Sequence, residues 1–235
     1  SYYLTGNITG AVDKHGIEVA ASGVTIDLNG FDLARVPGPG VFGGIKSSVA
    51  GLVDIAVKNG TVRNWDAGID LGSIITTGCR VENIRASGNL LDGIWVGVQS
   101  VVSGCAVSGG ADGIYSYNES VISNCSATGT SVVGLRVADG GTMTGCSAVA
   151  NAGVGFSGTD GCTLTACSAV NNSGGGFSLG DGCTISQCSA ASNAGSGILA
   201  GSNSLISSCS VSANTADGIL VGGTSLVVGN QCRGT

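Results

Sequence analysis

The feature that most constrains this chain is a repeat with a period of about 21 residues. A glycine followed by a large apolar residue closes each copy, and these glycines are Gly93, Gly113, Gly134, Gly155, Gly176, Gly197 and Gly218. The step between successive glycines is constant, except that the first step is shorter by one position. A fixed period of this length is typical of a solenoid, in which each repeat packs only against its neighbours. The repeat therefore predicts one continuous domain over residues 1–235.

The residues inside one repeat favour strands over helices. Apolar residues alternate with polar ones at Cys183 and Ile185 and, after a bend, at Cys188 and Ala190. The chain also has 43 glycines, and no stretch shows an apolar stripe of helical period. A repeat of about 21 residues has room for three short strands joined at corners, but not for a strand and a helix. We therefore expect an all-β, single-stranded parallel β-helix of about nine to ten coils, stacked ~4.8 Å apart.

Residues one period apart form columns, which we expect to stack from coil to coil. An inward aliphatic column consists of Val81, Val102, Ile122, Met143, Leu164, Ile185 and Ile206. A cysteine column consists of Cys105, Cys125, Cys146, Cys167, Cys188 and Cys209. An asparagine column, a few positions before the repeat glycines, consists of Asn64, Asn89, Asn151, Asn172, Asn193 and Asn214. We interpret these asparagines as left-handed corner residues whose amides hydrogen-bond between coils.

These columns resemble those of right-handed parallel β-helix proteins of the pectin-lyase-like superfamily, which carry asparagine ladders and inward aliphatic stacks. The resemblance covers nearly the whole chain. Residues 1–9, 14–31 and 57–65 are similar to the first coils of bacterial repeat proteins of this class that have no assigned activity. The resemblance implies the right-handed β-helix fold. It does not imply one activity, because this fold hosts lyases, hydrolases, epimerases, tailspikes and adhesins.

The first part of the chain differs from the rest in spacing and charge. The glycines Gly44, Gly68 and Gly93 are farther apart than the later repeat glycines, and two thirds of the charged residues lie within positions 1–100. We therefore expect longer, more charged coils over residues 1–100 and regular coils of the common period over residues 101–235. The opening strand should cover the first coil, and the proline-containing segment that follows should form a loop.

A carbohydrate site, if one exists, is expected on the early coils, where both tryptophans lie beside charged residues. An aromatic ring next to charged groups is a common way to hold a sugar. We expect Trp95 to point outward, whereas Trp65 could instead fill a corner. The candidate residues are Arg63, Trp65, Asp66, Asp70, Arg80, Glu82 and Trp95, with Asn64 and Arg85 nearby.

No catalytic residues are assigned from the sequence. A lyase would need a base beside calcium-binding carboxylates, and a hydrolase would need facing acids. Neither constellation is found, and we interpret the single histidine, His15, as a turn residue. The enzyme question stays open, and a protein without catalytic activity is favoured.

Three acidic residues, Asp139, Asp160 and Asp181, are spaced one period apart and should line one edge. Such a row could hold calcium, which prefers oxygen ligands. The alternative is that each Asp-Gly pair forms a turn, and this is favoured because the nine-residue calcium repeat is absent. No cofactor is expected, with calcium as the alternative.

The ten cysteines are expected to act first as small buried residues. The main hypothesis is a stack of free thiols. The alternatives are at least one disulfide and, last, a metal site. Cys232 is the best candidate for a disulfide because it leaves the column. Threonine and serine columns at Thr142, Thr144, Thr163, Thr165, Thr184 and Ser186 resemble ice-binding rows, although solvent-facing strands often carry such residues.

Charge and hydropathy limit the partners. The net charge of −6 without a basic stripe argues against nucleic acid, and no apolar run is long enough for a membrane span. No covering helix is expected after Val228. We favour the interpretation that the chain is a fragment or that its last few residues cover the final coil; the alternative is that this coil pairs head to tail with another copy. We expect an extracellular or cell-surface structural or adhesive rod without catalytic activity, able to assemble end to end into filaments. The alternative is a carbohydrate-binding, or polysaccharide-lyase-like or epimerase-like, β-helix that acts on acidic polysaccharide.

Overall fold

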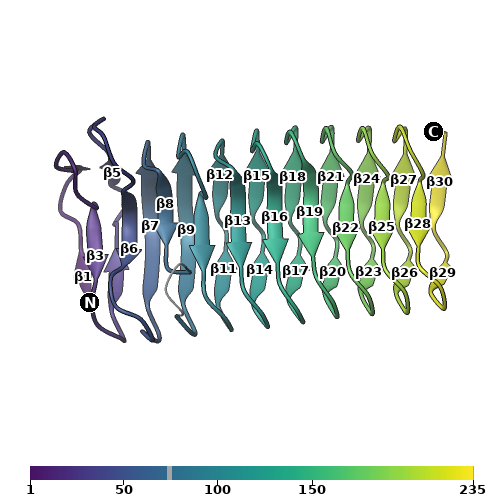
Figure 1. Cartoon of the computed structure of the whole chain (residues 1–235), viewed down its shortest axis with the longest axis horizontal. Helices are drawn as coiled ribbons and strands as arrows, with labels where there is room; N and C mark the ends of the chain where they lie inside the picture. Colours follow the sequence, from purple (N-terminus) through teal and green to yellow (C-terminus); the bar gives the residue numbers. More distant parts are fainter. Residues whose placement is uncertain (73–75, 235) are drawn as a thin grey trace.

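The chain forms one stack of parallel β coils (Figure 1). The computed structural model describes residues 1–72 and 76–234. These residues form about 11 turns of about 21 residues each, and no helix is found in them. The expected β-helix is confirmed. It has more coils than the nine to ten expected because residues 1–19 form a coil of their own and strands continue to Arg233. No helix in the described ranges is both long and apolar enough to cross a membrane.

Each complete coil contributes one strand to a ten-stranded parallel sheet. Its strands, in spatial order, are β3 (Ile17–Val19), β6 (Gly43–Ser47), β8 (Ala67–Asp70), β10 (Ile94–Val96), β13 (Asp112–Ser116), β16 (Val133–Val137), β19 (Val154–Gly158), β22 (Phe177–Leu179), β25 (Ile198–Ala200) and β28 (Ile219–Val221).

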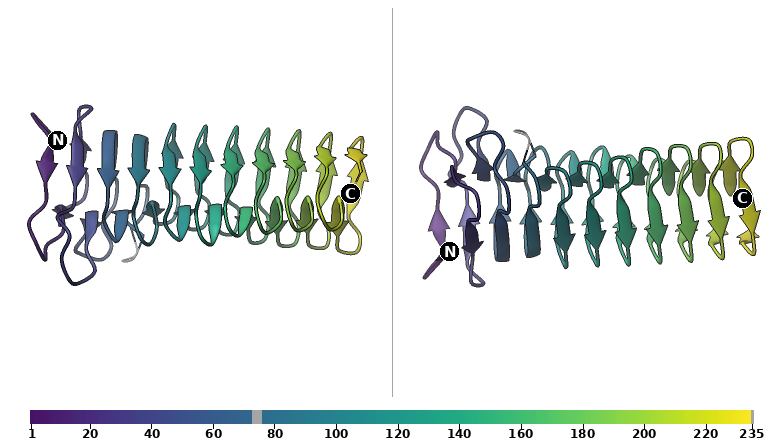
Figure 2. Two further views of the ribbon diagram at one scale, coloured as in Figure 1. Left: turned by 90° about the horizontal axis from the view of Figure 1, so that it is seen from above. Right: turned by 90° about the horizontal axis from the view of Figure 1, so that it is seen from below.

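The remaining strands form two further series along the rod. The first series is β1 (Tyr2–Tyr3), β4 (Thr25–Asp27), β11 (Val101–Ser103), β14 (Val121–Ser123), β17 (Thr142–Thr144), β20 (Thr163–Thr165), β23 (Thr184–Ser186), β26 (Leu205–Ser207) and β29 (Leu226–Val228). The second is β2 (Ile8–Thr9), β5 (Asp32–Ala34), β12 (Ala106–Ser108), β15 (Ser126–Thr128), β18 (Ser147–Val149), β21 (Ser168–Val170), β24 (Ser189–Ala191), β27 (Ser210–Ser212) and β30 (Gln231–Arg233). Two long strands, β7 (Ala56–Arg63) and β9 (Arg80–Ser87), run through both series and join them into one 20-stranded sheet. Figure 2 shows the coils in register along the rod.

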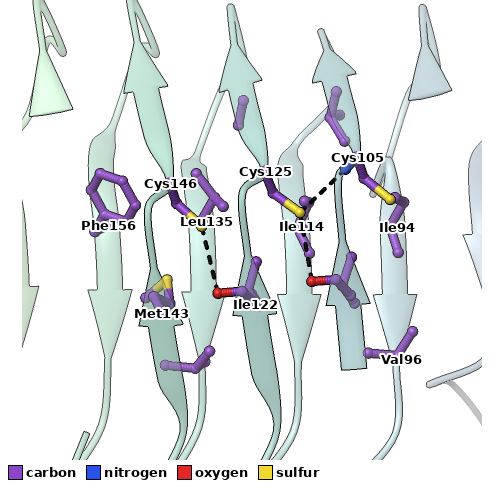
Figure 3. Close-up of a cluster of buried hydrophobic side chains, with 14 of the residues drawn as sticks. Ile94, Val96, Cys105, Ile114, Ile122, Cys125, Leu135, Met143, Cys146 and Phe156 are labelled. Carbon is purple, nitrogen blue, oxygen red and sulfur yellow. Dashed lines mark hydrogen bonds between the residues drawn. The ribbon is translucent and has the colours of Figure 1, made fainter. Parts of the chain in front are cut away.

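The core is built from the predicted inward columns. Every member of the aliphatic column from Val81 to Ile206 has no exposed surface. Phe156 and Phe177, the apolar residues after two repeat glycines, stack with ring centroids 4.8 Å apart and planes 8° apart. Each such side chain stabilises the fold by ~1.5–3 kcal/mol through burial. Figure 3 shows this packing around Ile122, Met143 and Phe156.

The asparagine ladder forms with the expected hydrogen bonds between coils, but its asparagines are not the left-handed corner residues. The left-handed corner falls one residue earlier, for example on Ala150 and Asn171, with φ of 54° and 56°. The ladder asparagines are buried, and Asn172 Nδ2 donates to Asn193 Oδ1 at 2.9 Å and to the Ala148 carbonyl at 3.2 Å. Their role is therefore to hydrogen-bond between coils, which satisfies amides that water does not reach.

One position of the predicted ladder needs correction. Asn64 has a φ of 62° and lies exposed at the left-handed corner, outside the ladder. Its neighbour Trp65 occupies the ladder position instead, since the Trp65 amide donates to Asn89 Oδ1 at 3.0 Å. Farther along, Thr130 precedes Asn151 and donates to Asn151 Oδ1 through both its amide and its hydroxyl.

The first residues do not cover the first coil; they form it. Strands β1 and β2 pair in parallel with β4 and β5. The proline-containing segment is a loop, as expected, and Arg35 fixes it by donating to the carbonyls of Gly38 and Gly40, both at 3.0 Å. His15 lies beside this loop, where its Nδ1 accepts the Gly43 amide at 2.8 Å.

Candidate functional site

One outward-facing row of the ten-stranded sheet carries charges and aromatic rings in register. We call it the outward row. Its residues alternate with buried ones such as Ile94 and Ile114 and therefore face away from the core. Strand pairing aligns Glu18, Lys46, Asp70, Trp95, Tyr115, Arg136, Ser157, Ser178, Leu199 and Leu220. Charged or aromatic side chains fill the first six positions only, so the chemistry is concentrated on strands β3 to β16.

Three aromatic side chains cluster at the centre of this row. The Trp95 and Tyr115 rings stack with centroids 5.9 Å apart and planes 8° apart. Tyr117 lies tilted against both, with centroids 6.0 Å from Trp95 and 5.1 Å from Tyr115. The Arg136 guanidinium lies 5.4 Å from the Tyr115 centroid. Because Trp95 and Arg136 come from the strands on either side of Tyr115, both faces of that ring are covered. A ligand would meet its edge and its hydroxyl.

Carboxylates surround this cluster. Asp70 pairs with Lys46 at 2.5 Å, and Asp112 pairs with Arg136 at 3.3 Å. Asp112 Oδ1 also accepts the Val133 amide at 3.1 Å. Asp92 precedes strand β10, and burial, followed by the nearby charge of Asp112, raises the pKa of Asp92 to about 6. Burial also raises the pKa of Asp112, although Arg136 opposes this effect. The site therefore gains a negative charge as the pH rises through about 6.

The structure brings together only two of the predicted carbohydrate residues, Asp70 and Trp95. Three others, Arg63, Arg80 and Glu82, lie on strands of the 20-stranded sheet. Arg63 pairs with Asp32 at 2.7 Å, while Arg80 pairs with Glu82 at 3.2 Å on strand β9. Arg85 is exposed farther along the same strand. These groups belong to a different face from the outward row.

Two candidates are inside the protein. Trp65 has no exposed surface, and its Nε1 donates to the Leu33 carbonyl at 3.0 Å. Asp66 is buried and accepts hydrogen bonds from Arg35 and from the Phe42 amide, both at 2.5 Å. Their expected place in a binding surface is therefore wrong. Both residues instead link early coils through these hydrogen bonds.

The three periodic aspartates form a ladder of their own. Asp139 Oδ1 accepts the Asp160 amide at 3.3 Å, and Asp160 Oδ1 accepts the Asp181 amide at 2.8 Å. Asp181 Oδ1 accepts the Ser202 amide at 2.7 Å. One oxygen of each carboxylate is thus engaged in holding the next coil. Across residues 1–72 and 76–234, no group of three or more histidine, cysteine or acidic residues could hold a metal ion. Calcium at these aspartates stays a prediction.

All ten cysteines are free in the structure, and the nine in columns are buried. The exception is Cys232, which is exposed. Its column neighbour is Val211, and the cysteine column ends instead with Asn230, whose Oδ1 accepts the Cys209 amide at 2.8 Å. Burial raises the pKa of Cys79. The thiol stack is therefore a core element.

The sequence contained a signal for the residues that were missed. Lys46, Tyr115 and Arg136 each follow a glycine and an apolar residue, as Trp95 does. Applying the outward assignment of Trp95 to every copy of the repeat would have selected the whole row. Asp92 and Asp112 could not be selected in this way, because their importance depends on burial beside Arg136.

The comparisons with known proteins agree with this architecture. The family described as "Right handed beta helix region" matches residues 43–184 and 142–234. The A-module of the Azotobacter vinelandii mannuronan C-5 epimerase AlgE4 superposes with a TM-score of 0.76 at 18% identity, over 98% of this chain and 74% of that one.

Two further solved structures share the fold at lower similarity. The periplasmic alginate epimerase AlgG gives a TM-score of 0.60 at 9% identity, over 95% of this chain and 76% of that one. The tailspike protein 2 of bacteriophage CBA120 gives a TM-score of 0.56 at 13% identity, over 96% of this chain and 38% of that one. No curated protein sequence matches the chain. The family match spans most of the sequence and agrees with the observed coils, and the chain therefore belongs to the right-handed β-helix family.

Proposed function

We propose that this protein binds a polysaccharide along the outward row, outside the cell or at its surface. The supporting observation is the aromatic cluster of Trp95, Tyr115 and Tyr117 beside the Arg136–Asp112 pair. Tyrosine hydroxyls and carboxylates bind sugar hydroxyls, and the guanidinium can bind a sugar carboxylate. Two proteins of similar structure are named as epimerases of mannuronan and alginate, which supports a polysaccharide as the ligand class.

The row has the length that an extended glycan needs. Strands β6, β8, β10, β13 and β16 lie on five successive coils, so their outward residues extend over ~19 Å at ~4.8 Å per coil. This segment of the row begins with Lys46 and ends with Arg136, and the aromatic cluster lies between them. A chain of uronic acid units lying along the rod would meet a cation near each end of the segment.

Asp92 gives this proposal a defined pH dependence. Above its pKa of about 6, Asp92 is charged and repels a uronate. Below that pH it is neutral and can donate a hydrogen bond. The affinity for a polyuronate should therefore rise as the pH falls from 7 to 5, whereas the affinity for a neutral glucan should change little.

The test is a binding titration with polymannuronate and with a neutral glucan. Tyr115→Ala and Arg136→Ala should each weaken polymannuronate binding ~10-fold or more, since each removes a central contact. Ser178→Ala, in the same row but outside the cluster, is the matched control. Equal polymannuronate affinities for the wild type and the three variants would reject the site. Lyase activity is tested on the same samples, because ultraviolet absorbance from unsaturated ends would show cleavage in addition to binding.

A second proposed function is end-to-end association into a structural rod. Strand β29 at the last coil exposes Leu226, Val227 and Val228, which are 61%, 44% and 51% exposed. At the first coil, Tyr2 and Tyr3 are 70% and 71% exposed beside an apolar hollow that Ile17 and Val24 help to line. Sedimentation over a concentration series tests this. A monomer at every concentration would reject association, and Val227→Lys should abolish any filament.

A further inference from the structure

Arg136 is held by one ion pair and keeps most of its hydrogen-bond donors free. Its Nη1 lies 3.3 Å from Asp112 Oδ2, which belongs to the only carboxylate paired with this guanidinium in residues 1–72 and 76–234. A guanidinium carries five N–H donors in a rigid fork, and a contact through one nitrogen occupies few of them. The Arg136 side chain is also 34% exposed. The carboxylate of a bound glycan can therefore reach donors that Asp112 leaves free.

Asp112 is the fixed partner in this pair. Its side chain is 10% exposed, and its Oδ1 accepts the Val133 amide of the next coil at 3.1 Å. Arg136, in contrast, lies over the Tyr115 ring at 5.4 Å from the centroid, a contact that sets no direction for its N–H groups. A rotation of the guanidinium in its own plane can therefore exchange one carboxylate for another.

The second cation of the outward row is paired more closely. Lys46 Nζ lies 2.5 Å from Asp70 Oδ2, and the Lys46 side chain is less exposed than that of Arg136. The attraction between opposite charges falls with distance, so the pair at Arg136 is the weaker of the two. Arg136 is therefore the cation that a ligand carboxylate engages more easily.

We propose that Asp112 is a specificity-determining residue, which competes with the carboxylates of a polyuronate for Arg136 and so weakens the binding of acidic glycans relative to neutral ones. This inference rests on the proposed glycan site. When a uronate binds the guanidinium, two carboxylates share one cation and repel each other, which lowers the affinity. A neutral glycan binds through its hydroxyls, so the Arg136–Asp112 pair stays in place and no competition arises.

Asp112→Asn tests the competition, because it removes the charge and its amide oxygen can still accept the Val133 amide. The affinities are measured at a pH of about 7.5, above the Asp92 pKa of about 6, so that Asp92 is charged. We expect Asp112→Asn to bind polymannuronate ~10-fold more tightly than the wild type, because the repulsion is removed. Its affinity for a neutral glucan should not change. Circular dichroism checks that the β signal is retained.

Two further variants secure this comparison. Asp112→Ser should give the same increase, and the fold accepts serine at this position because Ser196 precedes a repeat glycine in the same way. Asp217→Asn is the matched control. Asp217 also precedes a repeat glycine and its substitution removes the same charge, but the outward row has Leu220 there instead of a cation. Asp217→Asn should leave both affinities unchanged.

The last variant combines Asp112→Asn with Arg136→Ala. Without the guanidinium there is no cation to compete for, so most of the ~10-fold increase should be lost relative to Arg136→Ala alone. An equal increase in both backgrounds would overturn the proposal, because Asp112 would then act by general repulsion. An equal increase in Asp217→Asn would overturn it for the same reason.

The remaining outcomes separate this inference from the proposed function. If Arg136→Ala weakens polymannuronate binding but Asp112→Asn does not strengthen it, the glycan site stands and the competition is overturned. Weaker binding by Asp112→Asn overturns it as well, and would show that Asp112 positions Arg136 for the ligand. If Arg136→Ala has no effect, or if the wild type does not bind polymannuronate, both the proposed function and this inference are wrong.

Discussion

The ladder asparagine Asn193 should be far more important for stability than its exposed relative Asn171. Asn193 is 1% exposed and makes four side-chain hydrogen bonds. Its Oδ1 accepts from the amide and from Nδ2 of Asn172, at 3.0 and 2.9 Å. Its Nδ2 donates to Asn214 Oδ1 at 2.9 Å and to the Ala169 carbonyl at 3.1 Å. In Asn193→Ala, the buried backbone N–H and the side-chain Nδ2 of Asn172 both lose Asn193 Oδ1 as their acceptor.

The expected cost follows from these contacts. Leaving a buried donor unpaired costs ~1–3 kcal/mol, and the lost bonds to Asn214 and Ala169 add ~1 kcal/mol or more. We therefore expect Asn193→Ala to lower the free energy of unfolding by ~2–4 kcal/mol. Asn171→Ala should cost less than ~1 kcal/mol, because Ala150 and Ala213 already occupy equivalent left-handed corners with φ of 54° and 52°.

Guanidinium unfolding followed by circular dichroism measures both variants, with the midpoint and the slope fitted separately. A similar cost for the two substitutions would mean that the left-handed corner, and not the amide ladder, determines the choice of asparagine. A cost below ~1 kcal/mol for Asn193→Ala would contradict the hydrogen-bond argument directly.

Three further substitutions test other parts of the structure. The pKa of Asp92 is raised from 3.8 to about 6 by burial, so the folded state binds its proton more tightly than the unfolded chain does, and stability should fall as the pH rises from 4 to 6. The loss of stability is below ~3 kcal/mol, because the side chain is partly solvated. Asp92→Asn should remove this pH dependence in thermal melts across the same pH range. Ile185→Asp places a charge in the aliphatic column and should unfold the coils around it, so a wild-type melting temperature would disprove its inward position. Phe177→Ala should cost ~3–5 kcal/mol in chemical unfolding by emptying the ring stack on Phe156, and a cost near zero would mean that the stack is not a core contact.

The fold was predictable because one pattern repeats. The spacing of the repeat glycines aligned the coils, and the alternation within one coil gave the inward columns. The early coils were less predictable because their lengths differ. The predicted ladder was therefore off by one residue at Asn64, and the ladder position of Trp65 was missed. Its ring is buried there, with Nε1 bonded to the Leu33 carbonyl.

The candidate site was predictable only in part. An outward position can be counted from a strand period, and this gave Trp95 correctly. The sheet to which each charged residue belongs could not be inferred in this way. Arg63 and Arg80 precede Trp95 in the early coils but lie on the other sheet. The perturbed carboxyl group of Asp92 arises from burial and from its neighbour Asp112, which are properties of three-dimensional contact.

The stacking of coils also decides how the molecule responds to force. The backbone hydrogen bonds between coils run along the rod. A pull on its two ends therefore acts on every interface between coils, and the interfaces break one at a time. We expect the terminal coils to peel away singly at low force. Each coil of about 21 residues then releases ~70 Å of extended chain, which gives a regular sawtooth of contour-length steps. A load applied across the rod is shared by many coils at once. We therefore expect the molecule to be weak under a pull along the rod and resistant to a load across it.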